Sequence, residues 1–347
     1  MKLKIKNKKV DYPIIQGGMG VGISLGRLAG SVALEGGMGT ISMANIGYKE
    51  EDFYKNSRQA NIRGFKKELE EARSISRGRG LIGVNIMVVG TQYEELARIA
   101  GEENVDYIIC GAGIPLNLPE LVENKDVFLA PIVSSLRALQ VINKVWKKKY
   151  NRFPDFIVVE GKGAGGHLGF KMDGIETGKN LEDLTLEIVN YLRELGEDIP
   201  IFVAGSVYDG HDLRKFRELG ATGIQIGTRF IGTYECDADI RFKEFVVSSN
   251  KEDLTIIKSQ VGIPGRAIKN KFLHDIEKTR RPAKKCINCL QTCNPRETQF
   301  CISDALISAV KGDIDNALIF AGSNLDRVKE IVSVKSLMEK IIKEYEE

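Results

Sequence analysis

The sequence predicts an α/β protein built on a (β/α)8 TIM barrel, with a C-terminal cap extension of mostly helices and loops. Short apolar segments bounded by Gly and Pro alternate with longer segments whose apolar residues recur at helical spacing. Several short segments are apolar on both faces, which is typical of parallel strands covered by helices. A doubly wound open sheet is the alternative architecture.

Eight of the short segments are predicted to be strands, and all of them end before residue 230. Eight strand–helix units in about 240 residues match the usual size of a TIM barrel. One intervening helix is indicated by Leu213, Phe216 and Leu219, with Gly220 as its natural end. The predicted strands are Pro13–Gln16, Gly39–Met43, Leu81–Val88, Asp106–Gly111, Phe128–Val133, Asp155–Glu160, Ile199–Ala204 and Gly223–Gly227.

The strand–helix pattern stops near residue 250, so we divide the chain into a barrel, residues 1–250, and a C-terminal cap, residues 251–347. VGIPGRAIKN, residues 261–270, is expected to be a loop. Helices are expected over Ile302–Gly312 and Asp326–Glu344. The N-terminal MKLKIKNKKV alternates lysine with apolar residues and predicts a short strand.

Composition excludes several classes of protein. The 50 Lys and Arg residues against 47 Asp and Glu residues are too balanced to indicate nucleic acid or a membrane surface as partner. No segment approaches the roughly 20 apolar residues of a membrane helix, and the N-terminus lacks the apolar core of a signal peptide. We therefore expect a cytoplasmic protein whose six cysteines are thiols or ligands rather than disulfides.

In a TIM barrel the functional site lies where the strands end and the following loops begin. The first predicted strand ends in QGGMGVG, Gln16–Gly22, whose glycines allow the backbone to approach a ligand. A dinucleotide-binding turn would need an acidic residue at the end of the next strand, and SMANIG has none. A tight turn without a ligand is the other alternative.

Two further strand ends carry polar side chains. Asn85, in GVNIM, needs hydrogen-bond partners, which could be a ligand or neighbouring backbone. VVEGKGAGGHLG, Val158–Gly169, places Glu160 at a strand end and His167 in a glycine-rich loop. Of the three histidines, His167 is the one expected on the catalytic face, where it could transfer a proton or only orient the loop.

Small residues end the seventh and eighth predicted strands, in VAGSVYDG (Val203–Gly210) and GIQIGTRF (Gly223–Phe230). They free backbone N–H groups, and Ser206 and Thr228 add hydroxyl donors. TIM barrels commonly hold a phosphate at these two strands. The pair of motifs therefore predicts a phosphate cradle.

Five motifs in this order, QGGMG, GVNIM, EGKGAGGHLG, VAGS and QIGTRF, resemble the nitronate monooxygenase family. That family is similar to the FMN-dependent enoyl-acyl-carrier-protein reductase II. The resemblance covers about residues 10–235 well and extends more loosely through the cap. It implies an FMN cofactor, whose redox chemistry the protein positions and tunes.

By motif position, the resemblance implies that His167 is the active-site histidine. Many relatives carry an acidic residue just before the AGGH run, where this chain has Gly163 beside Lys162. Lys162 could lie near the flavin and favour an anionic substrate, or it could point to solvent. The implied or expected cofactor contacts are Gly18, Met19, Asn85, Glu160, Gly165, Gly205, Ser206, Gln225, Ile226, Gly227 and Thr228.

Four cysteines, Cys286, Cys289, Cys293 and Cys301, follow the spacing C-x2-C-x3-C-x7-C. They could hold zinc or an iron–sulfur cluster, or they could be reduced thiols that pack a loop. The spacing is not a common zinc pattern, and we assign no metal ligand. Cys110 ends a predicted strand and is expected to be a small core residue rather than a nucleophile.

Three functions are compatible with these residues. The first is the FMN-dependent oxidation of alkyl nitronates by O2, with His167 as base or charge-stabilising residue. The second is an NAD(P)H-dependent reduction of an enoyl thioester, and the third is a flavin redox partner with a cysteine-ligated metal centre. We expect a small-molecule substrate, either a nitronate or an enoyl thioester, and the chain could form a homodimer.

Overall fold

The computed structural model describes residues 3–5, 8–170, 172 and 174–347. Within these residues, eight parallel strands form a closed barrel, so the open-sheet alternative is wrong. Each of the eight predicted strands is confirmed to within two residues at either end. The barrel strands are β3 (Ile14–Gln16), β4 (Met38–Ser42), β5 (Leu81–Met87), β6 (Tyr107–Gly111), β7 (Phe128–Val133), β8 (Ile157–Glu160), β10 (Ile201–Ala204) and β11 (Gly223–Ile226).

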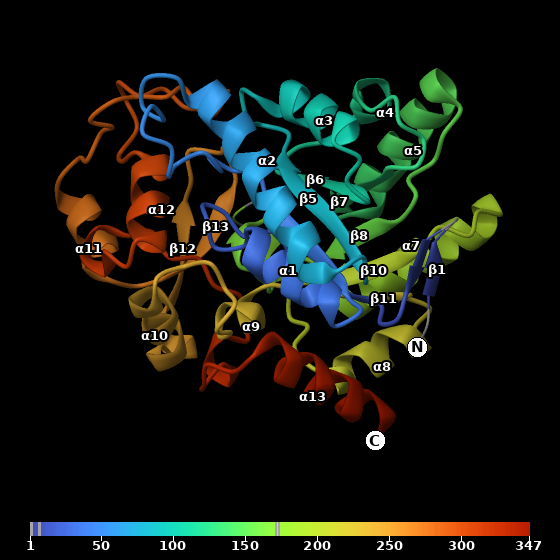
Figure 1. Ribbon diagram of the computed structural model, residues 1–347. Helices are drawn as coiled ribbons and strands as arrows, with labels where there is room; N and C mark the ends of the chain where they lie inside the picture. Colours follow the sequence, from blue (N-terminus) through green and yellow to red (C-terminus); the bar gives the residue numbers. More distant parts are fainter. Residues whose placement is uncertain (1–2, 6–7, 171, 173) are drawn as a thin grey trace.

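Helices between the strands cover the outside of the barrel (Figure 1). Side-chain caps fix several of their starts; for example, Asn180 Oδ1 accepts a hydrogen bond from the backbone N–H of Asp183. These helices are α1 (Gly26–Leu34), α2 (Ser57–Ser76), α3 (Tyr93–Glu102), α4 (Leu118–Leu121), α5 (Leu136–Tyr150), α6 (Gly174–Thr177), α7 (Leu181–Leu195), α8 (Gly210–Glu218) and α9 (Thr228–Ile231).

Large side chains fill the inside of the barrel. The rings of Tyr107, Phe156 and Phe202 pack edge to face, with centroids 5.8 and 5.4 Å apart for successive pairs. A short hairpin, β1 (Leu3–Ile5) and β2 (Lys8–Val10), places apolar side chains in the same core. The N-terminal residues therefore form two strands where one was predicted.

The cap contains strands that were not predicted. β12 (Leu254–Lys258) and β13 (Pro264–Ile268) form an antiparallel hairpin, and β13 also pairs with β9 (Gly166–His167). The expectation of a loop over residues 261–270 is therefore wrong. Pro and Gly disfavour strands, so the local sequence did not indicate a strand here. Pairing with distant segments of the chain stabilises it.

The remaining cap elements surround this hairpin on one side of the barrel (Figure 1). The predicted helix over Ile302–Gly312 is confirmed, although it ends two residues earlier than expected. These elements are α10 (Ile240–Ser248), η1 (Lys251–Asp253), α11 (Lys271–Lys278), α12 (Ile302–Val310), η2 (Ile314–Asn316) and η3 (Leu325–Arg327).

The last helix, α13 (Val334–Glu346), returns to the barrel and packs against α1 and α8 (Figure 1). The expectation that this helix begins at Asp326 is wrong. Asp326 lies in the turn η3, and the helix begins after Ser333, whose Oγ accepts a hydrogen bond from the N–H of Ser336. The C-terminal helix thus packs on the outside of the barrel, beside the first and the eighth helices.

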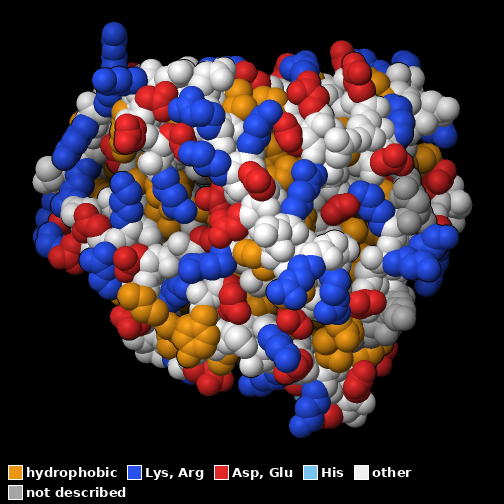
Figure 2. Space-filling model, viewed as in Figure 1, with side chains coloured by type: hydrophobic (Ala, Val, Ile, Leu, Met, Phe, Trp, Pro, Cys, Tyr) orange, Lys and Arg blue, Asp and Glu red, His pale blue; other side chains and the backbone are white. Residues whose placement is uncertain are grey.

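Charged side chains of both signs are mixed over the face of the molecule shown in Figure 2. This distribution agrees with the balanced composition, because neither sign forms a continuous patch on that face. Among the described residues, no helix has the length and apolar character needed to cross a membrane.

Candidate active site

A large cavity, about 1030 Å³ in volume, opens at the carboxyl ends of the barrel strands. Residues of the cap form its other wall, so the cavity lies between the barrel and the cap. Every residue predicted for the site lines it: Gly18, Met19, Asn85, Glu160, Gly165, His167, Gly205, Ser206, Gln225, Ile226, Gly227 and Thr228.

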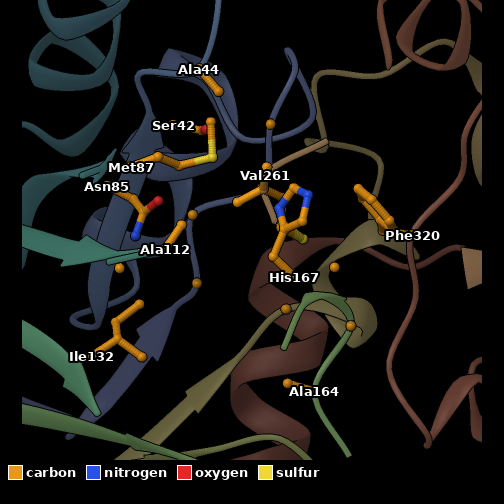
Figure 3. A pocket seen from close by; sticks show the side chains of 18 of the residues that line it. Ser42, Ala44, Asn85, Met87, Ala112, Ile132, Ala164, His167, Val261 and Phe320 are labelled. Atoms are coloured by element: carbon orange, nitrogen blue, oxygen red, sulfur yellow. The ribbon is translucent and has the colours of Figure 1, made fainter. Parts of the chain in front are cut away.

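The loop after β3 crosses the end of β5 at very short range. A Cβ at Gly18 would lie 2.3 Å from Cβ of Asn85, so only glycine allows this approach. The N–H of Met19 donates to Ser24 Oγ at 2.8 Å, and the N–H of Ser24 donates to the Met19 carbonyl at 3.0 Å. These bonds hold the loop in place, and the Asn85 amide projects into the cavity (Figure 3).

Two polar groups at the base of the cavity match a ligand that has both donors and acceptors. Oε1 of Gln225 is buried and, within the described part of the chain, accepts no hydrogen bond. Burial raises the pKa of Glu160 to about 8, so its carboxyl group is protonated at neutral pH and can donate a hydrogen bond.

The opposite end of the cavity is a cradle of hydroxyl groups and small residues from β8, β10, β11 and the cap. Ser206 Oγ and Ser323 Oγ lie 3.2 Å apart, and Thr228 Oγ1 accepts a hydrogen bond from the N–H of Gly322 at 2.9 Å. A Cβ at Gly163 would lie 1.7 Å from Ser206 Oγ. A side chain at this position would therefore require the hydroxyl groups of Ser206 and Ser323 to move.

Sequence reasoning missed two parts of the cavity lining, one of which belongs to this cradle. The cap supplies Ala321-Gly322-Ser323, the same tripeptide as Ala204-Gly205-Ser206 at the end of β10, and this repetition is the signal that could have found it. Arg229 also lines the cavity and brings a buried positive charge. Its guanidinium donates to the Tyr208 carbonyl at 2.7 Å and lies 3.6 Å from Glu344 Oε2.

His167 lies in β9, where pairing with β13 fixes its backbone opposite Gly265. Its Nε2 is 2.8 Å from Ser259 Oγ, and its ring packs edge to face with Phe320 at 5.2 Å (Figure 3). Burial lowers the pKa of His167 to about 4, so the imidazole is neutral at physiological pH. The ring faces the cavity from the side opposite Asn85 (Figure 3).

Arg266 of β13 binds the backbone of the loop that carries His167. Its guanidinium donates to the carbonyl oxygens of Lys162 at 2.6 Å and Ala164 at 3.1 Å. The ammonium group of Lys162 donates to the Gly178 carbonyl at 2.8 Å, and Lys162 does not belong to the described residues that line the cavity. Lys162 therefore does not face a ligand in the cavity.

Three cysteines of the cap, Cys286, Cys293 and Cys301, lie close enough to Cys289 to interact with it electrostatically. Among the described residues, which include all four of these cysteines, no three His, Cys, Asp or Glu side chains are arranged to hold a metal ion. Cys286 is exposed, whereas Cys289 lines the cavity and accepts a hydrogen bond from Ser303 Oγ at 3.0 Å. Cys110 is fully buried in β6, as expected of a core residue, and burial raises the pKa of its thiol.

A closed eight-stranded barrel with one large cavity at the carboxyl ends of its strands defines this protein as an enzyme of the TIM-barrel class. Its family follows from the sequence as a whole. The family model described as nitronate monooxygenase matches residues 1–344. The chain belongs to the nitronate monooxygenase family and is an oxidoreductase.

Individual relatives agree with this assignment. The chain is 25% identical over 292 residues to a probable nitronate monooxygenase of Staphylococcus saprophyticus, covering 76% of this chain and 78% of the relative. It is similar to the structure of FabK from Thermotoga maritima, with a TM-score of 0.72 and 25% identity over 97% of this chain and 93% of FabK. A nitroalkane oxidase from Streptomyces ansochromogenes shares the fold, with a TM-score of 0.73 and 19% identity over 97% and 96% of the two chains.

Proposed function

We propose that this enzyme binds FMN and oxidises alkyl nitronates with O2. The observation that carries the proposal is one cavity that joins an anion cradle at β10 and β11 to a neutral histidine near the mouth of the barrel. The cradle suits a phosphate, because small residues let backbone N–H groups approach an anion and the hydroxyl groups of Ser206 and Ser323 converge there.

The residues at the base of the cavity suit the ring system of FMN. The unpartnered Gln225 Oε1 would accept from a ring N–H group, and the protonated Glu160 and the Asn85 amide would donate to ring acceptors. When bound, FMN supplies the one-electron chemistry by which O2 oxidises a nitronate to a carbonyl compound and nitrite.

We propose that His167 binds the negatively charged nitronate group as a neutral hydrogen-bond donor. A histidine with a pKa of about 4 is a weak base, so it is poorly suited to remove the α-proton of a neutral nitroalkane. A preformed nitronate needs no such step. Ser259 Oγ, 2.8 Å from Nε2, keeps the ring oriented toward the substrate side of the cavity.

The test is oxygen uptake by protein reconstituted with FMN, using preformed nitronates of simple nitroalkanes. We expect oxygen consumption with release of nitrite, and little turnover of the neutral nitroalkanes at the same concentration. Absence of oxygen uptake with every nitronate, in protein that has bound FMN, would overturn the proposal.

The second candidate is NAD(P)H-dependent reduction of an enoyl thioester. The similarity to FabK over 97% of the chain favours it, as does a cavity at the upper end of the roughly 300–1,000 Å³ usual for one ligand. Rapid oxidation of NADH on addition of a crotonyl thioester, without oxygen uptake on nitronates, would select this function instead.

A further inference from the structure

Part of the cavity, here called the distal chamber, is lined by segments other than those of the phosphate cradle. Its walls come from the loops after β3 and β4, the first turns of α2 and α3, the segment Ile287–Leu290 of the cap, and α12. Its apolar lining consists of Val21, Ile23, Leu96, Ile287, Leu290, Ile302 and Leu306.

Hydrogen bonds hold the cap wall of the distal chamber against the barrel. Asn45 Nδ2 donates to Ser303 Oγ at 2.8 Å, and Ser303 Oγ donates to Cys289 Sγ at 3.0 Å. The N–H of Thr91 donates to the Cys289 carbonyl at 3.1 Å, and the N–H of Gln291 donates to the carbonyl of Val89 at 2.9 Å. The chamber is therefore built by the fold, and its walls do not depend on a ligand for their position.

The polar end of the distal chamber carries no unbalanced charge. Arg58 Nη2 lies 2.8 Å from Glu95 Oε2, which forms an ion pair. Asn61 Nδ2 donates to Gln92 Oε1 at 3.0 Å, and Gln92 Nε2 donates to Glu95 Oε2 at 3.0 Å. Because these groups satisfy one another, this end offers no free charge to recruit a charged ligand group.

We infer that the distal chamber binds the uncharged alkyl chain of the substrate, so that the enzyme prefers nitronates with long linear chains to short ones. This inference rests on the proposed nitronate oxidation and names its substrate class. The nitronate group would remain beside His167, and the chain would extend along Ile302 and Leu306 toward Arg58. Each methylene that leaves water for an apolar wall should increase kcat/KM by about threefold until the chamber is filled.

The first test compares kcat/KM for the preformed nitronates of nitroethane, nitrobutane, nitrohexane and nitrooctane. We expect a steady rise along the series, by at least about thirtyfold from nitroethane to nitrohexane. Equal values for all four, or a fall with length, would overturn the inference and leave the proposed function intact. Lack of turnover with any of them would instead contradict the proposed function.

A pair of substitutions at one position tests the location of the chain. Leu306→Trp should fill the chamber and bring the ratio of kcat/KM for nitrohexane to that for nitroethane close to one. Leu306→Ala should keep the preference and shift the optimum to longer chains. A merely destabilising effect would act in the same direction in both variants, so parallel losses for all chain lengths would overturn the inference.

A binding measurement tests the chamber without turnover. Octanoate resembles a long-chain nitronate in shape and charge, and acetate resembles a short one. We expect octanoate, but not acetate, to slow alkylation of Cys289 by N-ethylmaleimide by at least about fivefold, as quantified by peptide mass spectrometry. Cys286, which is exposed and does not line the cavity, is the internal control and should react at an unchanged rate. Unchanged alkylation of Cys289 with octanoate would overturn the inference.

Discussion

Two ionisable side chains of the cavity, Glu160 and His167, are neutral at physiological pH for the same physical reason. Burial disfavours the charged form of each group, which raises the pKa of Glu160 to about 8 and lowers the pKa of His167 to about 4. The cavity therefore presents hydrogen-bonding groups without added charge at these two positions, and the buried guanidinium of Arg229 is paired with Glu344.

The raised pKa of Glu160 predicts a pH-dependent stability of the protein without cofactor. The folded protein keeps a proton that the unfolded chain loses above its ordinary pKa of 4.5, so this group lowers stability as pH rises from about 4.5 to about 8. Over this pH range, we expect the free energy of unfolding of the Glu160→Gln protein to fall by about 1–3 kcal/mol less than that of the natural protein. Urea unfolding of both proteins near pH 5 and near pH 8 measures it. An identical pH dependence in the two proteins would refute the assignment.

The low pKa of His167 predicts how activity depends on pH. Because the imidazole is already neutral above about pH 4, kcat/KM with a preformed nitronate should show no ionisation of His167 near pH 6.5. His167→Gln should lower kcat/KM by about tenfold to a hundredfold, with the pH profile unchanged between about pH 5.5 and 8. A change in kcat/KM near pH 6.5 that is present in the natural protein and absent in His167→Gln would contradict this prediction.

At the scale of elements, the site depends on a strand pairing between distant parts of the chain. β9 carries His167, and β13 of the cap pairs with it while Arg266 binds the backbone of the preceding turn. Pairing of this kind is a tertiary contact, and it positions the histidine more strongly than anything in the glycine-rich loop itself.

Removing the Arg266 guanidinium should loosen the histidine loop. We expect Arg266→Leu to increase hydrogen exchange over residues 161–168 and to lower kcat/KM by about tenfold, because the imidazole is no longer held in place. Lys269→Ala, at an exposed site just after the same strand, is the matched control and should change neither quantity. Unchanged hydrogen exchange over residues 161–168 in Arg266→Leu would show that the position of the loop does not depend on this guanidinium.

The elements predicted from the sequence are those with a strong local pattern. Several of the barrel strands are apolar on both faces, and the motifs at the strand ends line one cavity. β13 begins with Pro264 and Gly265, and it is stabilised by pairing with β9 and β12 and by backbone hydrogen bonds to the segment 319–321. Ala321–Ser323 joins the cradle through a long-range contact, which periodicity in the sequence cannot reveal.

At the scale of the whole molecule, the barrel and the cap alternate along the chain. α10 and the cap elements η1 to α12 follow the last barrel strand, and α13 then packs on α1 and α8. The segment between β11 and α13 thus supplies the cap residues that line the cavity. The last helix, α13, packs on the outside of the barrel against α1 and α8 (Figure 1).

The return of α13 predicts that it stabilises the barrel. Ile341 is fully buried, so Ile341→Ala should lower the free energy of unfolding by about 2–4 kcal/mol. Lys340→Ala, at the exposed neighbouring position, is the control and should have little effect. Urea unfolding followed by circular dichroism measures both. A loss below about 0.5 kcal/mol in Ile341→Ala would mean that the helix contributes little to the fold.

The central claim is that the cradle formed by Gly163, Ser206, Thr228 and Ser323 binds the phosphate of FMN. Calorimetric titration of the cofactor-free protein with FMN and with riboflavin, which lacks the phosphate, tests it most directly. We predict one FMN bound per chain, at least about a hundredfold more tightly than riboflavin, because several hydrogen bonds to a charged phosphate are lost with it. Equal affinities for the two molecules, or no binding of FMN, would contradict the account.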